Sequence, residues 1–91
     1  MEKGMSDIYL TDREDGFIEI EQQNTRNAVI EQYIRVRKNQ GLTQAELAKR
    51  AGIPRTNITR FESCNYNPSL EMMVKIASAL NMKVQIQLVG K

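Results

Sequence analysis

The chain has 91 residues, of which 41% are hydrophobic and 26% charged, with no histidine and a single cysteine, Cys64. This length predicts one domain with a modest core, and the shortage of His and Cys excludes the usual zinc sites, Cys–His nucleophiles and Ser–His–Asp triads. We therefore expect no catalytic residues, no metal and no cofactor. A lone cysteine fits the reducing cytoplasm, and without an apolar run of roughly 20 residues we expect no membrane partner.

The net charge of +2 is distributed unevenly along the chain. Residues 1–23 carry seven acidic and two basic side chains, whereas residues 24–91 carry four acidic and eleven basic ones. The first segment therefore has a net charge of −5 and the second a net charge of +7. We expect an acidic N-terminal arm followed by a basic domain, and the basic domain is the part that a polyanion would contact.

The acidic arm, residues 1–23, has a weak strand pattern between residues 6 and 21. Apolar side chains such as Ile18 and Ile20 alternate with polar ones, and the preceding Asp15-Gly16 pair is typical of a turn. The pattern is compatible with a loose hairpin. The acidic composition is equally compatible with a disordered tail, so both interpretations are kept.

A helical pattern follows the arm and begins the domain predicted for residues 24–81. Asn24 or Thr25 can cap this helix, which we expect to run to about Asn39, and Gly41 ends it. The helical spacing predicts one apolar face, made of Val29, Ile30, Tyr33 and Ile34.

The second predicted helix is short and runs from Thr43 to about Arg50. Glu46 follows Thr43 at the spacing of a capping box, in which each side chain accepts a hydrogen bond from the other residue's backbone. Gly52 is expected to take the positive φ that turns the chain toward the next helix. Two short helices joined by a tight turn are typical of a helix-turn-helix unit.

The third predicted helix runs from Pro54 to about Ser63 and has two different faces. Ile58 and Phe61 lie on the face expected to pack into the core. The opposite face carries two guanidinium groups and two hydroxyl groups with an amide at its flank, from Arg55, Thr56, Thr59, Arg60 and Asn57. Arg can read guanine, Asn can read adenine, and Thr can contact a thymine methyl or a phosphate. This helix is therefore suited to the major groove of double-stranded DNA.

A polar loop and a fourth helix complete the predicted domain. Ser69 can cap this helix. Its apolar side chains recur at the spacing of one helix face and comprise Leu70, Met73, Ile76, Ala77 and Leu80.

The last segment, residues 82–91, changes to the two-residue period of a strand. Val84, Ile86 and Leu88 alternate with polar side chains. A single strand leaves its backbone groups unpaired, so we expect it to pair with the same strand of a second copy across a two-fold axis. Pairing with residues 17–21 of the same chain is the alternative. The predicted fold is mainly α, a compact helix-turn-helix bundle of four to five helices with this C-terminal β-strand as a dimerisation element.

Over roughly residues 30–80, two sequence motifs resemble the Xre/Cro family of helix-turn-helix repressors. They are TQAELAKRAGIPRTNITRFE, which begins at Thr43, and NPSLEMMVKIASALN, which begins at Asn67. The resemblance implies a structural ion pair between Arg37 and Glu62. The DNA-binding site expected from the residues and the resemblance together consists of Gln44, Arg55, Thr56, Asn57, Thr59, Arg60, Tyr66 and Asn67. Tyr66 can alternatively pack on its loop.

Two positions depart from the pattern of that family. Pro54 stands where a capping Ser or Thr is usual, so the third helix must be capped in another way. Cys64 stands where a Gly is usual, and a left-handed backbone strains a residue with a side chain. We therefore expect Asn65 to take the left-handed conformation instead.

The C-terminal LNMKVQIQLV segment makes the resemblance narrower, because it is similar to antitoxins of the HigA and HipB kind. This resemblance implies a homodimer that represses its own operon at a palindromic operator and neutralises a toxin, either a RelE-like nuclease or a HipA-like kinase. The alternatives are a stand-alone Xre-type regulator without a toxin and a protein-interaction module that uses the fold without DNA. The acidic arm suits a basic partner and is equally compatible with a solubilising tail.

Overall fold

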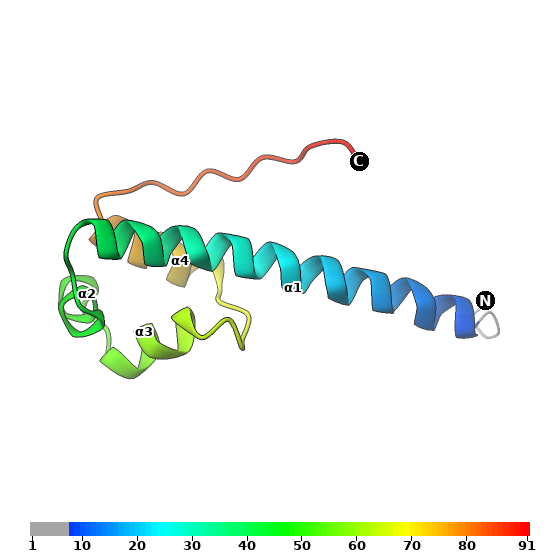
Figure 1. Ribbon diagram of the computed structural model, residues 1–91, viewed down its shortest axis with the longest axis horizontal. Helices are drawn as coiled ribbons and strands as arrows, with labels where there is room; N and C mark the ends of the chain where they lie inside the picture. The colour runs from blue at the N-terminus through cyan, green and yellow to red at the C-terminus, as the bar shows by residue number, and fades with distance from the viewer. Residues whose placement is uncertain (1–7) are drawn as a thin grey trace.

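The computed structural model describes residues 8–91 and contains four α-helices in this range (Figure 1). They are α1 (Ile8–Asn39), α2 (Gln44–Ala51), α3 (Arg55–Glu62) and α4 (Leu70–Ala79). The short helices α2, α3 and α4 gather against the C-terminal half of α1. The prediction of a mainly α, compact helix-turn-helix bundle is therefore confirmed.

One hydrophobic core joins all four helices. Tyr33 of α1 meets Phe61 of α3 edge to face, with ring centroids 4.9 Å apart, a geometry that aromatic pairs favour. The Tyr33 hydroxyl donates to the Met73 carbonyl oxygen of α4 at 2.9 Å. The buried members of the core are Ile30, Leu47, Ala48, Ile58, Phe61, Ile76 and Leu80.

The helix α1 is much longer than predicted and corrects two expectations. It begins at Ile8 and passes through residues 24 and 25 without a break, so neither Asn24 nor Thr25 caps it. The hairpin and the disordered tail are both wrong for residues 8–23, and the part of the arm before residue 8 lies outside the described residues. Glu and Gln, which fill much of residues 19–23, favour helix, and the packed half of α1 supplies a helix to extend. The blue half of α1 projects beyond the rest of the bundle (Figure 1).

The turns around α2 follow the predicted local chemistry. The Thr43 side chain accepts from the backbone N–H of Glu46 at 3.0 Å, and the Glu46 carboxylate accepts from the Thr43 N–H at 2.8 Å. These two bonds complete the capping box. The pKa of Glu46 is lowered, first by the Thr43 backbone N–H that its carboxylate accepts and then by the Thr43 side chain. Gly41 and Gly52 have φ values of 71° and 70°, so both turns use the left-handed conformation that glycine adopts without strain.

The loop after α3 corrects one further expectation. Cys64, and not Asn65, adopts the left-handed conformation, with φ of 64°. At the other end of α3, Pro54 occupies the N-cap position without a side-chain capping bond. Ser69 caps α4 as predicted by accepting from the Met72 N–H at 3.0 Å, but Leu70 remains 54% exposed although it continues the apolar stripe.

The C-terminal segment, residues 82–91, forms no strand in the described chain. It runs extended and back along α1 (Figure 1), and Lys91 Nζ lies 3.1 Å from Glu21 Oε1. The predicted strand and its alternative pairing with residues 17–21 are therefore wrong for the single chain, since residues 17–21 are helical. A strand is defined by hydrogen bonds to a neighbouring strand, and a helix cannot supply them. We call residues 82–91 the tail.

No helix among residues 8–91 is both long enough and apolar enough to span a bilayer.

Candidate nucleic-acid interface

The structure places the polar side of α3 toward solvent and the apolar side in the core. Ile58 and Phe61 are fully buried, and this burial fixes the rotation of the helix about its axis. Arg55, Thr56, Thr59 and Arg60 are exposed, and Asn57 is half-buried. Exposed basic residues also end the neighbouring helix α2, at Lys49 and Arg50. The exposed side of this pair of helices can therefore attract an anionic polymer.

Arg37 and Glu62 form a buried ion pair between α1 and α3. Arg37 Nε donates to Glu62 Oε2 at 2.7 Å, and Arg37 Nη2 donates to Glu62 Oε1 at 3.0 Å. Arg37 Nη1 also donates to the Leu42 carbonyl oxygen at 2.7 Å. The two side chains are only 10% and 6% exposed, so this bidentate pair is shielded from water. It fixes the C-terminal end of α3 to α1 and to the turn before α2.

Gln44 continues this pair into a network that sequence reasoning did not find. Its Nε2 donates to Glu62 Oε1, and its Oε1 accepts from Thr59 Oγ1, both at 2.9 Å. The half-buried Gln44 therefore bridges the first turn of α2 and two positions of α3. The sequence holds no local signal for this bridge, because its members are brought together only when α1, α2 and α3 pack.

Tyr66 and Arg60 are held together beside α3. The Arg60 guanidinium carbon lies 5.8 Å from the centre of the Tyr66 ring, within the range of a cation–π interaction. Tyr66 is half-buried and packs against the core. The ring therefore supports an arginine of the exposed face. In the single chain without DNA, Tyr66 packs on its neighbours, as the packing alternative expected.

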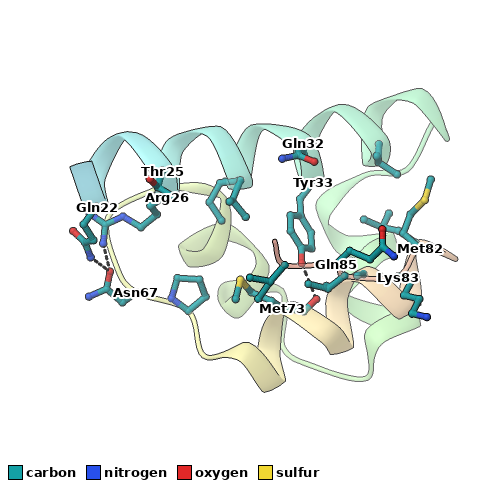
Figure 2. A pocket seen from close by; sticks show the side chains of 18 of the residues that line it. Gln22, Thr25, Arg26, Gln32, Tyr33, Asn67, Met73, Met82, Lys83 and Gln85 are labelled. Carbon is teal, nitrogen blue, oxygen red and sulfur yellow. Dashed lines mark hydrogen bonds between the residues drawn. The ribbon is translucent and has the colours of Figure 1, made fainter. Parts of the chain in front are cut away.

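Asn67 ties the α3–α4 loop to α1. Its Oδ1 accepts from Gln22 Nε2 at 2.5 Å and from Arg26 Nη1 (Figure 2). Asn67 thus lies apart from the Gln44–Thr59 network, and its carbonyl oxygen is already used by α1. Of the expected site residues, Gln44 and Thr59 contact each other, as do Arg60 and Tyr66, whereas Asn67 is fixed to a different helix.

A separate apolar cleft of about 790 Å³ lies between α1, α4 and the tail (Figure 2). Val29 and Tyr33 of α1 line it together with Met73 of α4 and Val84 of the tail. Among residues 8–91 no three His, Cys, Asp or Glu side chains are grouped so that they could hold a metal ion. The exposed surface of its lining is mostly apolar, although polar side chains such as Gln32 and Gln85 also border it.

Comparison with known proteins gives a consistent result for this architecture. A family of helix-turn-helix domains matches residues 34–86. An uncharacterised HTH-type transcriptional regulator of Archaeoglobus fulgidus is 43% identical over 49 residues, which are 54% of this chain and 70% of that protein. The immunity repressor of Bacillus phage phi105 is 39% identical over 49 residues, 54% of this chain and 34% of that protein.

A solved structure shares the fold at lower sequence identity. A toxin–antitoxin module from Streptococcus pneumoniae contains a chain that superposes with a TM-score of 0.65 at 24% identity, with 79% of each chain covered. At this identity the likeness shows the fold alone.

Proposed function

We propose that this chain, which belongs to the Xre-type helix-turn-helix family, is a sequence-specific repressor. It binds double-stranded DNA through the exposed face of α3. The observation that carries this proposal is the division of α3, with Ile58 and Phe61 buried and Arg55, Thr56, Thr59 and Arg60 exposed. A helix held in this way can enter the major groove with its polar side chains against base edges.

The geometry of each side chain supports a particular role for it in the proposed DNA contact. Arg55 begins α3 and is exposed, as suits a residue that reads a base. Asn57 lies at the flank of the same turn. Arg60 rests on Tyr66, which limits its motion and suits a contact to phosphate. Asn67 has its amide nitrogen left for a phosphate oxygen, because Gln22 and Arg26 occupy its carbonyl oxygen.

We further propose that the protein acts as a homodimer on a palindromic operator. The tail is extended and carries Ile86 and Leu88 exposed, with Val84 half-buried. The same tail in a second copy would give its backbone the ladder partner that the single chain does not supply. A two-fold axis between the tails would present two α3 helices to half-sites about one DNA turn apart.

The projecting half of α1 supports a second part of the proposal, that the regulator is the antitoxin of a toxin–antitoxin pair. Phe17, Ile18 and Ile20 are each more than 60% exposed, and Glu19 and Glu21 lie between and beside them on the same turns. An exposed apolar helix with acidic flanks suits a groove with a basic rim. A toxin of the RelE-like or HipA-like kind is the partner we propose, and the fold shared with a toxin–antitoxin chain is consistent with it.

The DNA-binding proposal is tested by titrating the protein onto duplex DNA from immediately upstream of its own gene, at two salt concentrations and with unrelated competitor. We expect binding that survives competitor and weakens with salt, with a slope of roughly 0.9 for each phosphate contact. Arg55→Ala should weaken operator binding by about 1–3 kcal/mol. Arg35→Ala removes an exposed arginine of α1 and should leave the affinity for the operator unchanged. Equal affinity for operator and competitor would refute sequence-specific repression.

The antitoxin proposal has a separate test, co-purification with the product of the adjacent gene. The double variant Phe17→Ala, Ile20→Ala should lose that partner while keeping its affinity for DNA. If both variant residues are dispensable for capture, the projecting half of α1 is not the docking element. If the adjacent product does not bind the wild type, the chain is a stand-alone regulator.

A further inference from the structure

We propose that Glu62 is a positioning residue that fixes which hydrogen-bonding groups Gln44 and Thr59 present to DNA. In this arrangement Gln44 offers DNA one N–H donor and contacts a phosphate, whereas Thr59 offers only acceptor lone pairs and a methyl group and contacts base edges. The assignment deepens the proposed DNA binding and rests on it. It follows from the order of hydrogen bonds that begins at Arg37.

The first step is that Glu62 can only accept hydrogen bonds. An arginine remains protonated in proteins, and the Arg37 guanidinium donates to both oxygens of Glu62 inside the fold. The carboxylate held by this bidentate pair has lone pairs and no proton. Any further partner of Glu62 must therefore be a donor.

The second step fixes the orientation of the Gln44 amide. Its nitrogen must face Glu62, as observed at 2.9 Å, because a carbonyl oxygen there would meet a second acceptor. The amide oxygen is then directed to Thr59 Oγ1, again at 2.9 Å. Since that oxygen cannot donate, the Thr59 hydroxyl must give its proton to Gln44.

The third step concerns what remains for DNA. Gln44 keeps one N–H, and the phosphate oxygens of DNA accept. Its carbonyl oxygen is engaged by Thr59, so the paired donor and acceptor needed to read adenine are not both free. Thr59 has no proton left for a phosphate. Its lone pairs match the amino groups of cytosine or adenine, and its methyl group matches the thymine methyl.

Gln44 is thereby a residue for affinity and Thr59 one for sequence preference. The polarity of both is set by the charge of Arg37 on α1, which acts on them through Glu62. Glu62→Gln would be the direct variant, but it leaves Arg37 charged and buried without its partner. The order of hydrogen bonds is therefore tested from its far end, at Thr59 and Gln44.

The free protein provides a test that does not depend on DNA. In a proton–nitrogen NMR spectrum, we expect the side-chain amide of Gln44 to be shifted away from that of Gln32, which is exposed on α1. Thr59→Val should move the Gln44 amide resonances, while Thr56→Val, at an exposed threonine of the same helix, should leave them in place. Gln44 resonances that match those of Gln32 and ignore Thr59→Val would overturn the proposal.

The DNA test compares an operator duplex selected from a random pool with an unrelated duplex. Gln44→Ala should weaken binding to the unrelated duplex about tenfold, for a lost hydrogen bond to a charged group, and binding to the operator by at least that factor, because Thr59 also loses its partner. Thr59→Val should weaken binding to the operator and leave the unrelated duplex unchanged, and Gln32→Ala should change neither. A Gln44→Ala defect confined to the operator would show that Gln44 reads a base and would overturn the assignment. Failure of the wild type to select any duplex would instead refute DNA binding, with the NMR result still deciding the orientation of the amide.

Discussion

Apolar side chains are buried in the helix-turn-helix body and exposed in the two extensions of the chain. The body is α2, α3 and α4 with the packed half of α1, and the extensions are the projecting half of α1 and the tail. In the body, Ile58 and Ile76 have no exposed surface. Side-chain caps begin α2 and α4, and core contacts fix all three short helices. In the extensions, Phe17 of α1 is 72% exposed and Leu88 of the tail is 94% exposed. Exposed apolar patches typically mark interaction surfaces. The body thus carries its own stability, whereas the extensions are built to be covered.

The same division appears in the ion pairs. The pair in the body, Arg37 with Glu62, is buried and bidentate, while the pair between the extensions, Lys91 with Glu21, is largely exposed. An exposed pair is screened by water and contributes little. The extensions are therefore held to one another only weakly in the single chain, which leaves them free to exchange this contact for a partner.

The largest expected effect comes from truncating a phenylalanine in each region. Phe61→Ala removes a buried ring that contacts Tyr33 and should lower the free energy of unfolding by about 3–5 kcal/mol. Phe17→Ala should change it by less than about 0.5 kcal/mol, as for a surface site. Urea unfolding followed by circular dichroism measures both. Similar losses for the two variants would mean that the extension is part of the cooperative core.

Removing one carboxylate from each ion pair is expected to have the second-largest effect. Glu62→Ala leaves the Arg37 charge buried and should lower the free energy of unfolding by about 3 kcal/mol. Glu21→Ala exposes nothing new and should cost no more than about 0.5 kcal/mol. The two variants are compared by the same urea titration. A small loss for Glu62→Ala would indicate that water reaches Arg37 in the native state.

Where the chain uses local chemistry, the sequence was sufficient to predict the structure. The Thr43–Glu46 box, the left-handed turn at Gly52 and the Ser69 cap each depend on residues within one turn of helix. The burial of Ile58 and Phe61 follows from their spacing on α3. These features are short-range, so a pattern of residue types is enough to identify them.

Where distant segments decide, the sequence was not sufficient. Ile18 and Ile20 alternate as in a strand, yet they continue a helix whose other half is fixed in the core. The left-handed Cys64 belongs to a loop that Asn67 ties to α1. The link from Glu62 through Gln44 to Thr59 exists only once three helices have packed. The conformation of the tail depends on contacts with other segments, and the two-residue period of its own side chains does not specify them.

Glycines in the two regions should respond to alanine with opposite signs. Gly52 has φ of 70°, so Gly52→Ala places a side chain in the left-handed region and should destabilise by about 1–2 kcal/mol. Gly16 lies within α1 with no atom within 4 Å of an added Cβ, so Gly16→Ala should stabilise by about 0.5–1 kcal/mol. Melting temperatures of the two variants are sufficient to show the signs. A destabilising Gly16→Ala would argue that α1 is not helical at that position in solution.

The smallest expected effect is a pH dependence that belongs to the body alone. Glu46 has a pKa lowered from its ordinary value of 4.5, first by the backbone N–H of Thr43 and then by the Thr43 side chain. A carboxylate with a lowered folded pKa stabilises the native state fully above its unfolded pKa, and this stabilisation is lost as the pH falls through the folded value. Glu46→Gln should therefore be less stable than the wild type at pH 7, and the difference should shrink as the pH falls below about 4.5 and through the lowered pKa.

The control for this last comparison is Glu31→Gln, which removes the same charge from an exposed position within α1. Unfolding free energies at pH 7, 5, 4 and 3 for the wild type and both variants separate the capping bond from the general effect of net charge. If the two variants follow the same curve, the box contributes through charge alone. If the unfolding free energy of Glu46→Gln alone approaches that of the wild type in acid, ionised Glu46 stabilises the first turn of α2. The capping box then contributes to the stability of the body.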